Sequence, residues 1–264
     1  MSQLKYYIEL YIAYFKVNMK SVMIYDIDYL IGIVAMIIKN IVNFGLILLL
    51  FHIIENIEGW TFNEMLFLYG YSTTAFAIWH CFFINVITIP YYIKIGTFDR
   101  FLLKPVNPIF QIMMDGFDED GWGELIFGII VLMIAIIRLD IWSYKLMFLP
   151  ILLFSSCFIY AGLSLIASTV SFFTIGSVDL TNLAMECQEF TKYPISIYNF
   201  SFRILFTCII PVGFAAFYPS LYYMSKYMQG VKWLIITPLV TFGFFVLSCK
   251  LWNKALQMYS SSGS

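Results

Sequence analysis

Long apolar segments recur along the chain and are separated by shorter polar stretches. A helix needs roughly 20 residues to cross a hydrocarbon core about 30 Å thick. Six segments reach or approach that length and are predicted to span a membrane: 28–54, 64–90, 121–138, 145–175, 194–218 and 232–252. The pattern therefore predicts one all-α transmembrane domain over residues 1–264, with six spans and both ends on the same side.

Residues 1–22 follow a different pattern. Apolar side chains recur there at helical spacing, and lysines and a glutamate occupy the opposite face. The apolar positions are Leu4, Ile8, Tyr11, Ile12, Phe15 and Met19. A plain solvated helix would leave this aromatic-rich face in water, so the pattern favours an amphipathic helix lying at the membrane surface. At the other end, residues 255–264 finish in YSSSGS and are predicted to form a polar tail.

Composition agrees with a membrane protein and indicates its orientation. Hydrophobic residues make up 61% of the chain and charged residues only 12%, against roughly 25% charged in soluble domains. The net charge of −1 gives no indication of nucleic-acid binding. Most Lys and Arg residues fall on one predicted side, and short loops rich in them stay in the cytoplasm. Both termini and the loop between the second and third spans are thus expected to be cytoplasmic.

That loop contains a short charged helix, within IKIGTFDRFLLKPVNPIFQ at 93–111. Asp99 suits the positive end of a helix dipole and Lys104 the negative end, and Pro105 ends the helix. Phe98 and Phe101 fall on one face. Seven or eight residues make a helix too short to be stable alone in water, so either the membrane surface or a groove on a partner protein must hold it.

Three polar residues lie within the first predicted span. Lys39 is placed near its middle, where a charge is costly and is expected to face protein or water. Asn43 lies one turn further on the same face, and Asn40 is adjacent. These residues are interpreted as a polar patch that lines a substrate path or a subunit interface. The alternative is a shifted span in which Lys39 extends to the membrane surface.

Prolines interrupt the fifth predicted span. Pro211 lies inside it and Pro219 just after it. A proline inside a membrane helix frees backbone carbonyl groups and kinks the helix. The fifth span is therefore predicted to be broken near Pro211, with a partly re-entrant piece that runs to Pro219.

Motifs for independent chemistry are missing from the sequence. It contains no GxxxxGK[ST], so no P-loop for ATP is predicted, and it lacks GxSxG and HExxH. Five scattered cysteines and two isolated histidines, His52 and His80, show no metal-ligand spacing. The acidic stretch 115–124 lacks the spacing of a calcium loop and is interpreted as a solvated turn. We predict no enzymatic activity, no metal and no cofactor for this chain.

Two sequences carry a resemblance to a known family: GTFDRFLLKPVNPIFQ after the second span and KYPISIYNFSFRILFTCIIPVGFAAFYPS around the fifth. Together with the chain length and the YSSSGS end, they resemble the ABC-2 family of ABC-exporter permeases, in its bacterial branch of six-span subunits without a fused ATPase. The resemblance implies that the short charged helix is a coupling helix that docks on a separate ATPase subunit. The positions it assigns to coupling are Gly96, Asp99, Arg100, Leu103, Lys104 and Pro105, with Phe98 and Phe101 as the apolar face.

The resemblance further implies two ATPase subunits that hold ATP and Mg, and a second permease that is identical or related. The substrate path would lie between the permeases, lined by spans one, two and five, in a bacterial cytoplasmic membrane. Exporters of drugs, antimicrobial peptides, lipids and polysaccharides belong to this family. The leading hypothesis is an ATP-driven exporter of an amphipathic substrate. A self-sufficient secondary carrier or channel is the alternative, and the lack of carboxylates near the middle of the predicted spans disfavours a carrier.

Overall fold

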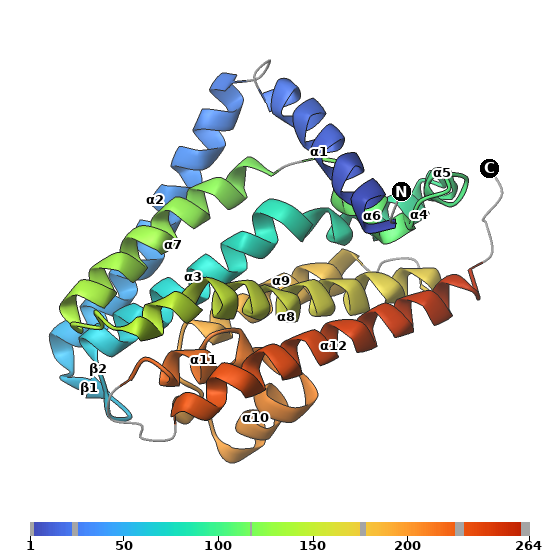
Figure 1. Ribbon diagram of the computed structural model, residues 1–264. Helices are drawn as coiled ribbons and strands as arrows, with labels where there is room; N and C mark the ends of the chain where they lie inside the picture. Colours follow the sequence, from blue (N-terminus) through green and yellow to red (C-terminus); the bar gives the residue numbers. More distant parts are fainter. Residues whose placement is uncertain (1–2, 23–25, 117, 175–177, 225–229, 260–264) are drawn as a thin grey trace.

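The computed structural model describes residues 3–22, 26–116, 118–174, 178–224 and 230–259, and this part of the chain is helical apart from one small hairpin (Figure 1). The longer helices are α1 (Gln3–Val22), α2 (Asp26–Ile53), α3 (Phe62–Phe83), α7 (Glu119–Arg138), α8 (Leu149–Thr169), α9 (Val178–Thr191) and α12 (Trp233–Leu256). The shorter helices are α4 (Ile89–Lys94), α5 (Asp99–Leu102), α6 (Pro108–Met113), α10 (Phe200–Ile204) and α11 (Phe217–Leu221).

Shorter elements join these helices. The hairpin pairs β1 (Asn56–Ile57) with β2 (Trp60–Thr61), in a register that places Asn56 opposite Thr61 and Ile57 opposite Trp60. Glu58 and Gly59 between the strands both have positive φ, of 51° and 78°, as a type I′ hairpin turn requires. Turns of 3₁₀ helix occupy Ile84–Thr88, Tyr144–Phe148, Val170–Phe172, Ile195–Ile197, Val212–Ala215 and Gly230–Lys232, and Leu205–Ile209 forms a π-helix.

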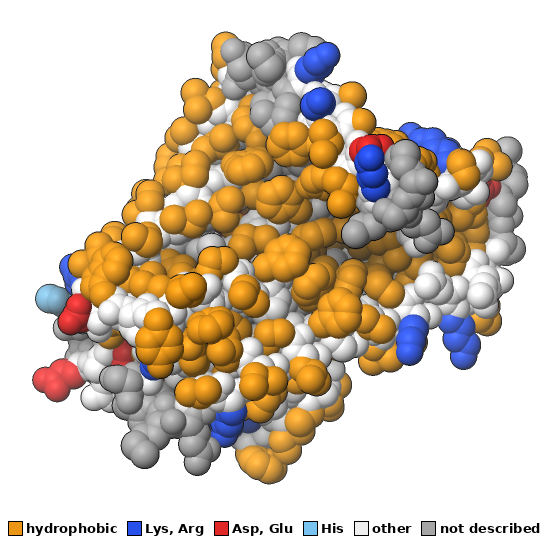
Figure 2. All heavy atoms as spheres, viewed as in Figure 1, with side chains coloured by type: hydrophobic (Ala, Val, Ile, Leu, Met, Phe, Trp, Pro, Cys, Tyr) orange, Lys and Arg blue, Asp and Glu red, His pale blue; other side chains and the backbone are white. Residues whose placement is uncertain are grey.

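Five helical segments in the described part of the chain are long and apolar enough to cross a membrane. They are Ile27–Ile53, Phe62–Lys94, Asp120–Arg138, Tyr144–Phe172 and Gly230–Leu256. Each overlaps one of the six predicted spans. Figure 2 shows a broad surface of hydrophobic side chains over these helices, while Lys and Arg side chains gather around α1, the α4–α6 region and the end of α12. The chain is a multi-pass membrane protein.

The predicted fifth span, 194–218, is not a single helix. Its apolar helical part covers only Phe200–Ile209. Helical geometry stops at Ile210, which has φ −115° and ψ 88°, and Pro211 follows before another 3₁₀ turn and α11. Before this region, helix α9 already runs back alongside α8 (Figure 1). The hydropathy pattern did not indicate α9, because this helix carries Asp179, Glu186 and Glu189. The predicted fifth span is thus represented by a shorter apolar helix that ends next to Pro211.

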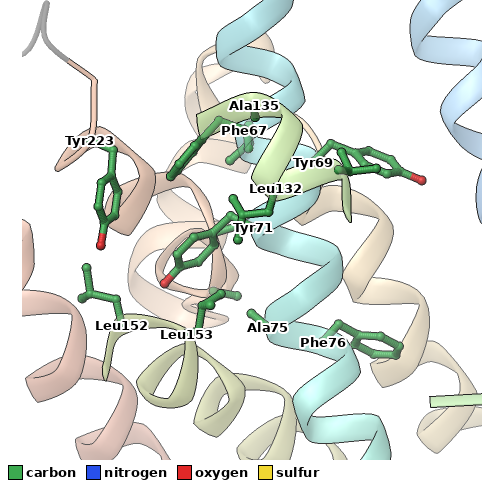
Figure 3. Packing of buried hydrophobic residues seen from close by; sticks show 14 of the residues in the cluster. Phe67, Tyr69, Tyr71, Ala75, Phe76, Leu132, Ala135, Leu152, Leu153 and Tyr223 are labelled. Carbon is green, nitrogen blue, oxygen red and sulfur yellow. The ribbon is translucent and has the colours of Figure 1, made fainter. Parts of the chain in front are cut away.

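The core is built around α3, which other helices cover on several sides. Figure 3 shows Tyr71 of α3 pointing between α7 and α8, toward Leu132 and Leu153. Gly70 allows α7 to approach closely, because a Cβ there would lie 2.6 Å from the backbone nitrogen of Leu132. Small residues at such crossings are typical of membrane helices. The Tyr71 hydroxyl also forms a buried hydrogen bond of 3.0 Å with Ser156 of α8.

Figure 1 places both termini and α4–α6 at one end of the helix bundle, and the hairpin, α10 and α11 at the other. Helix α1 runs across the first end instead of along the bundle. The Asn18 side chain donates a hydrogen bond to the carbonyl oxygen of Met114, 3.0 Å away. The Tyr7 ring contacts the Phe110 ring edge-on, with centroids 4.7 Å apart. This position suits the predicted helix at the membrane surface.

Candidate functional site

The loop between α3 and α7 folds into three short helices joined by tight turns. After α4, Gly96 takes a φ of +71°, which glycine adopts without the steric cost that other residues incur. The N–H groups of Thr97 and Phe98 both donate to the carbonyl oxygen of Tyr92, at 2.9 and 3.1 Å. Helix α5 then has four residues, Asp99–Leu102, fewer than the sequence suggested.

The aromatic residues of this element are buried within the chain itself. Phe98 is 0% exposed and Phe101 is 2% exposed. The Phe98 ring centroid lies 5.5 Å from that of Phe172, 6.1 Å from Trp252 and 5.4 Å from Tyr259. The sequence left open whether the membrane surface or a groove on a partner holds this aromatic face, and the family resemblance favoured the partner. In the structure both rings are buried inside the chain, because the ends of α8 and α12 supply an aromatic cluster in which they lose their contact with water.

A different set of side chains on this element faces outward. Leu103 is 86% exposed and Leu102 is 41% exposed. Lys104 and Pro105 are also exposed. These four residues form the surface, here called the α5 tip, that another molecule can reach.

Polar contacts hold α5 to the segment that follows α6. The Arg100 guanidinium donates to Oδ2 of Asp115 at 3.0 Å, and the Tyr92 hydroxyl donates to the same oxygen at 2.9 Å. Arg100 also stacks over the rings of Phe101 and Tyr92, with its guanidinium carbon 4.6 and 5.0 Å from their centroids. This pairing of Arg100 with both a carboxylate and aromatic faces uses properties that lysine lacks.

Three more hydrogen bonds hold α5 in place. The side-chain amide of buried Gln111 donates to the carbonyl oxygens of Phe101 and Val106, at 3.0 and 2.6 Å. The Tyr259 hydroxyl donates to Oδ1 of Asp99 at 3.1 Å. Burial raises the pKa of Tyr259, and its bond to Asp99 adds to that shift. The element is thus attached to α6 and to the segment after α12.

A cavity of about 500 Å³ opens near the same end of the bundle, between α2, α3, α9 and the start of α7. Lys39 of α2 lines it. Asn40 does not face it: Asn40 is 1% exposed and donates to the carbonyl oxygen of Met36 at 2.9 Å. Asn43 is half-buried elsewhere on α2. Of the three polar residues predicted to act together, Lys39 is the one that reaches this cavity.

A buried ion-pair group forms one wall of the cavity. Nδ1 of His80 lies 3.0 Å from Oε2 of Glu124, and Nε2 lies 3.6 Å from Oδ2 of Asp118. His80 and Glu124 are 4% and 3% exposed. Asp118 also caps α7 by accepting from the Asp120 N–H at 3.0 Å. Burial opposes ionisation of Asp118, but its bond to His80, the His80 charge and the Asp120 N–H together lower its pKa.

Sequence reasoning missed this group, since it treated His80 as an isolated packing residue and 115–124 as a solvated turn. One signal was available. His80 lies in the second half of the predicted span 64–90 and Glu124 near the start of the predicted span 121–138, so both are expected in the half of the membrane next to the loop that joins these spans. A charge inside a span favours a partner, which makes such a pair a candidate contact.

The proline positions predicted to break span five lie away from this site. Pro211 and Pro219 are both buried. Pro219 lies in α11, which Figure 1 places beside the hairpin, at the end opposite α5. In the described ranges, no three His, Cys, Asp or Glu side chains are grouped in a way that could hold a metal ion.

Apolar helices long enough to cross a membrane, together with a short surface helix, define a multi-pass membrane protein. A family model described as "ABC-2 family transporter protein" matches residues 11–263, so the chain belongs to this family. Its members are transmembrane components of ABC transporters and are not themselves catalytic, and the family implies ABC ATPase partners. No curated protein and no solved structure matches the chain.

Proposed function

We propose that this chain is the permease subunit of an ATP-driven exporter that moves an amphipathic substrate out of the cytoplasm. Separate ATPase subunits bind ATP and Mg and supply the energy. The observation that carries the proposal is the build of α5. Leu103 at the α5 tip is 86% exposed, while Phe98 at the start of the same element is fully buried. An exposed leucine on a rigid base suits a helix that docks in a groove.

The buried aromatic cluster explains how movement of α5 reaches the membrane helices. Phe172 follows directly after α8 and Trp252 lies in α12. Both rings pack against Phe98, at 5.5 and 6.1 Å. Packed aromatic side chains are not easily compressed, so a push on the α5 tip displaces the ends of both helices. Phe98 and Phe101 therefore act as internal connectors, and Leu103 and Lys104 act as the docking surface.

Charge and exposure support the remaining parts of the proposal. Lys and Arg side chains gather at the end of the bundle that holds α1, α4–α6 and the C-terminus (Figure 2), which favours a cytoplasmic position for this end and both termini. Lys39 is exposed among apolar side chains on α2, such as Ile38 at 56% and Ile41 at 54%. A second permease, identical or related, covers this face and shares the substrate path, while membrane lipid covers the rest.

Co-purification tests the proposal directly. The tagged chain is extracted from its native membrane in a mild detergent, and proteins that elute with it are identified. We expect a P-loop ATPase with the wild type, and we expect Leu103→Asp to remove it. Met258→Asp is the matched control, because Met258 is also apolar, 66% exposed and follows α12 at the same end of the helix bundle. Phe98→Ala should retain the ATPase but uncouple ATP hydrolysis from transport.

Three results would contradict this model. If Leu103→Asp keeps the ATPase, the α5 tip is not the docking surface. If α5 rests on the membrane surface instead, Leu103→Asp weakens binding of the chain to lipid and leaves any ATPase bound. If no ATPase elutes in several detergents while the chain alone moves a solute in liposomes, it is a self-sufficient carrier or channel.

A further inference from the structure

The cavity beside α2 has an excess of negative charge. Five carboxylates line it: Asp118, Asp120, Glu124, Glu186 and Glu189. Among the described residues, at most three cationic side chains face these carboxylates. They are Lys39 and His80 on the cavity wall and Lys192, whose ammonium group lies 2.6 Å from Glu189.

Internal pairing accounts for only part of this charge. His80 engages Glu124 and Asp118, and Lys192 engages Glu189. Glu186 lies on the exposed side of α9 and faces the cavity. A cavity with low-dielectric walls and one sign of charge concentrates ligands of the opposite sign.

A second and independent observation points to a ligand. Gln188 lines the same cavity, is 6% exposed, and its side-chain Nε2 has no hydrogen-bond partner. A buried donor without an acceptor costs free energy, because the hydrogen bond it made to water is not replaced. A ligand with a carbonyl or hydroxyl oxygen would satisfy it.

The other walls are apolar and adaptable. Met36 and Met185 bring flexible thioether side chains, and Phe76, Ile84 and Ile87 bring apolar area. Methionine-rich surfaces adjust to ligands of different shape, and an aromatic face attracts a cation. Binding sites for drug-sized molecules have volumes of about 300–1,000 Å³, and this cavity of about 500 Å³ lies within that range.

We propose that this cavity binds amphipathic amines of drug size, with a positive nitrogen near Glu186 and an acceptor oxygen at Gln188. The role of this cavity in export rests on the proposed function, in which an amine bound here lies on the substrate path. The assignment narrows the proposed class of substrate from amphipathic molecules in general to amphipathic molecules that carry a positive charge.

Dye binding to the purified full chain tests the assignment without an ATPase. The cationic probe is rhodamine 6G, the anionic comparison is carboxyfluorescein, and affinity is measured by fluorescence anisotropy in detergent. We expect the cation to bind at least about tenfold more tightly than the anion. Glu186→Gln should weaken cation binding about five- to tenfold through loss of charge attraction, and Gln188→Leu should weaken it severalfold. Asp179→Asn is the matched control, because Asp179 is also an exposed carboxylate of α9 but does not line the cavity.

Each outcome supports or overturns the assignment. Equal affinity for both dyes, or cation binding that Glu186→Gln and Asp179→Asn change equally, overturns it. Unchanged melting temperatures for the variants show that they are folded. If the ATPase elutes with the chain but Glu186→Gln has no effect on the cation, this inference fails and the exporter proposal stands. If the cation binds as expected but no ATPase elutes, the cavity assignment stands and the exporter proposal fails.

Discussion

The hydroxyl group of Tyr259 donates a hydrogen bond to Oδ1 of Asp99, 3.1 Å away, although the two residues are 160 positions apart in the chain. The same tyrosine ring contacts Phe98 and Phe172, at centroid distances of 5.4 and 5.3 Å. The segment after α12 therefore holds the first residue of α5 against the bundle. Because α5 has only four residues, it depends on such contacts for its structure.

Removal of this contact should loosen α5. We expect Tyr259→Phe to lose one hydrogen bond, worth about 1 kcal/mol, and Tyr259→Ala to lose the ring contacts as well. Amide hydrogen exchange at 97–104 should therefore quicken slightly in the first variant and strongly in the second. Met258→Ala is the control, because Met258 is 66% exposed. Unchanged exchange in Tyr259→Ala would show that α5 is held by its other contacts alone.

Close helix packing gives a second prediction, for Gly70. A Cβ at this position would lie 2.6 Å from the backbone nitrogen of Leu132, so Gly70→Ala must push α3 and α7 apart. Overpacking of this kind costs about 1–3 kcal/mol. Gly45 on α2 is the matched control, since a Cβ there meets no atom within 4 Å, and alanine improves helix propensity.

Thermal unfolding in detergent measures both glycine variants. Gly70→Ala should melt at a lower temperature than the wild type, and Gly45→Ala at the same or a higher temperature. Equal melting temperatures for the two variants would contradict the close approach of α3 and α7.

Five membrane helices could be located from the sequence because the hydrophobic pattern alone sets their length. The α5 element could be located from its charges and prolines, but the direction of its aromatic face could not. Phe98 and Phe101 share a face of the helix, yet the sequence does not say whether that face meets a partner or Trp252. Only the tertiary arrangement, which brings Trp252 beside Phe98, decides this.

Helix α9 was not predicted as part of the bundle for a related reason. Helix α9 carries polar residues, and hydropathy excludes such a segment from a span. Its buried Thr191 hydroxyl is satisfied by other helices, because it lies 2.6 Å from the Ser72 hydroxyl and 3.0 Å from the Tyr160 hydroxyl. Hydropathy averaged along one segment contains no information about partners on other helices. The cavity that α9 lines could therefore not be predicted from the sequence either.

The buried His80–Glu124 pair gives a third prediction. Loss of one partner from a buried pair costs about 3–5 kcal/mol, because the other group remains buried without compensation. We expect Glu124→Leu to lower the melting temperature strongly. The double variant His80→Leu/Glu124→Leu should be more stable than Glu124→Leu alone, because it also removes the buried His80 ring, whose remaining partner is the partly exposed Asp118. His52→Leu serves as the control, since His52 is exposed. Strictly additive effects would show that the two side chains do not interact.

Asp118 gives a prediction about pH. Its pKa is lowered in the folded protein, since the bond to His80, the His80 charge and the Asp120 N–H outweigh the effect of burial. A carboxylate with a lowered pKa stabilises the fold above its ordinary pKa of about 3.9, and that contribution is lost as the pH falls through the lowered value. The wild type should therefore be more stable than Asp118→Asn near neutral pH. This difference should shrink as the solution is acidified below about pH 4.

Denaturation of both proteins in detergent across this range measures the difference directly. His80 and Glu124 are present in both proteins, so the comparison isolates Asp118. Asp118 is 36% exposed at its side chain, and water therefore screens part of the interaction. The expected difference is smaller than that for Glu124. A stability difference that stays constant from neutral to acidic pH would mean that Asp118 acts only through the shape of the α7 cap, without a charge interaction with His80.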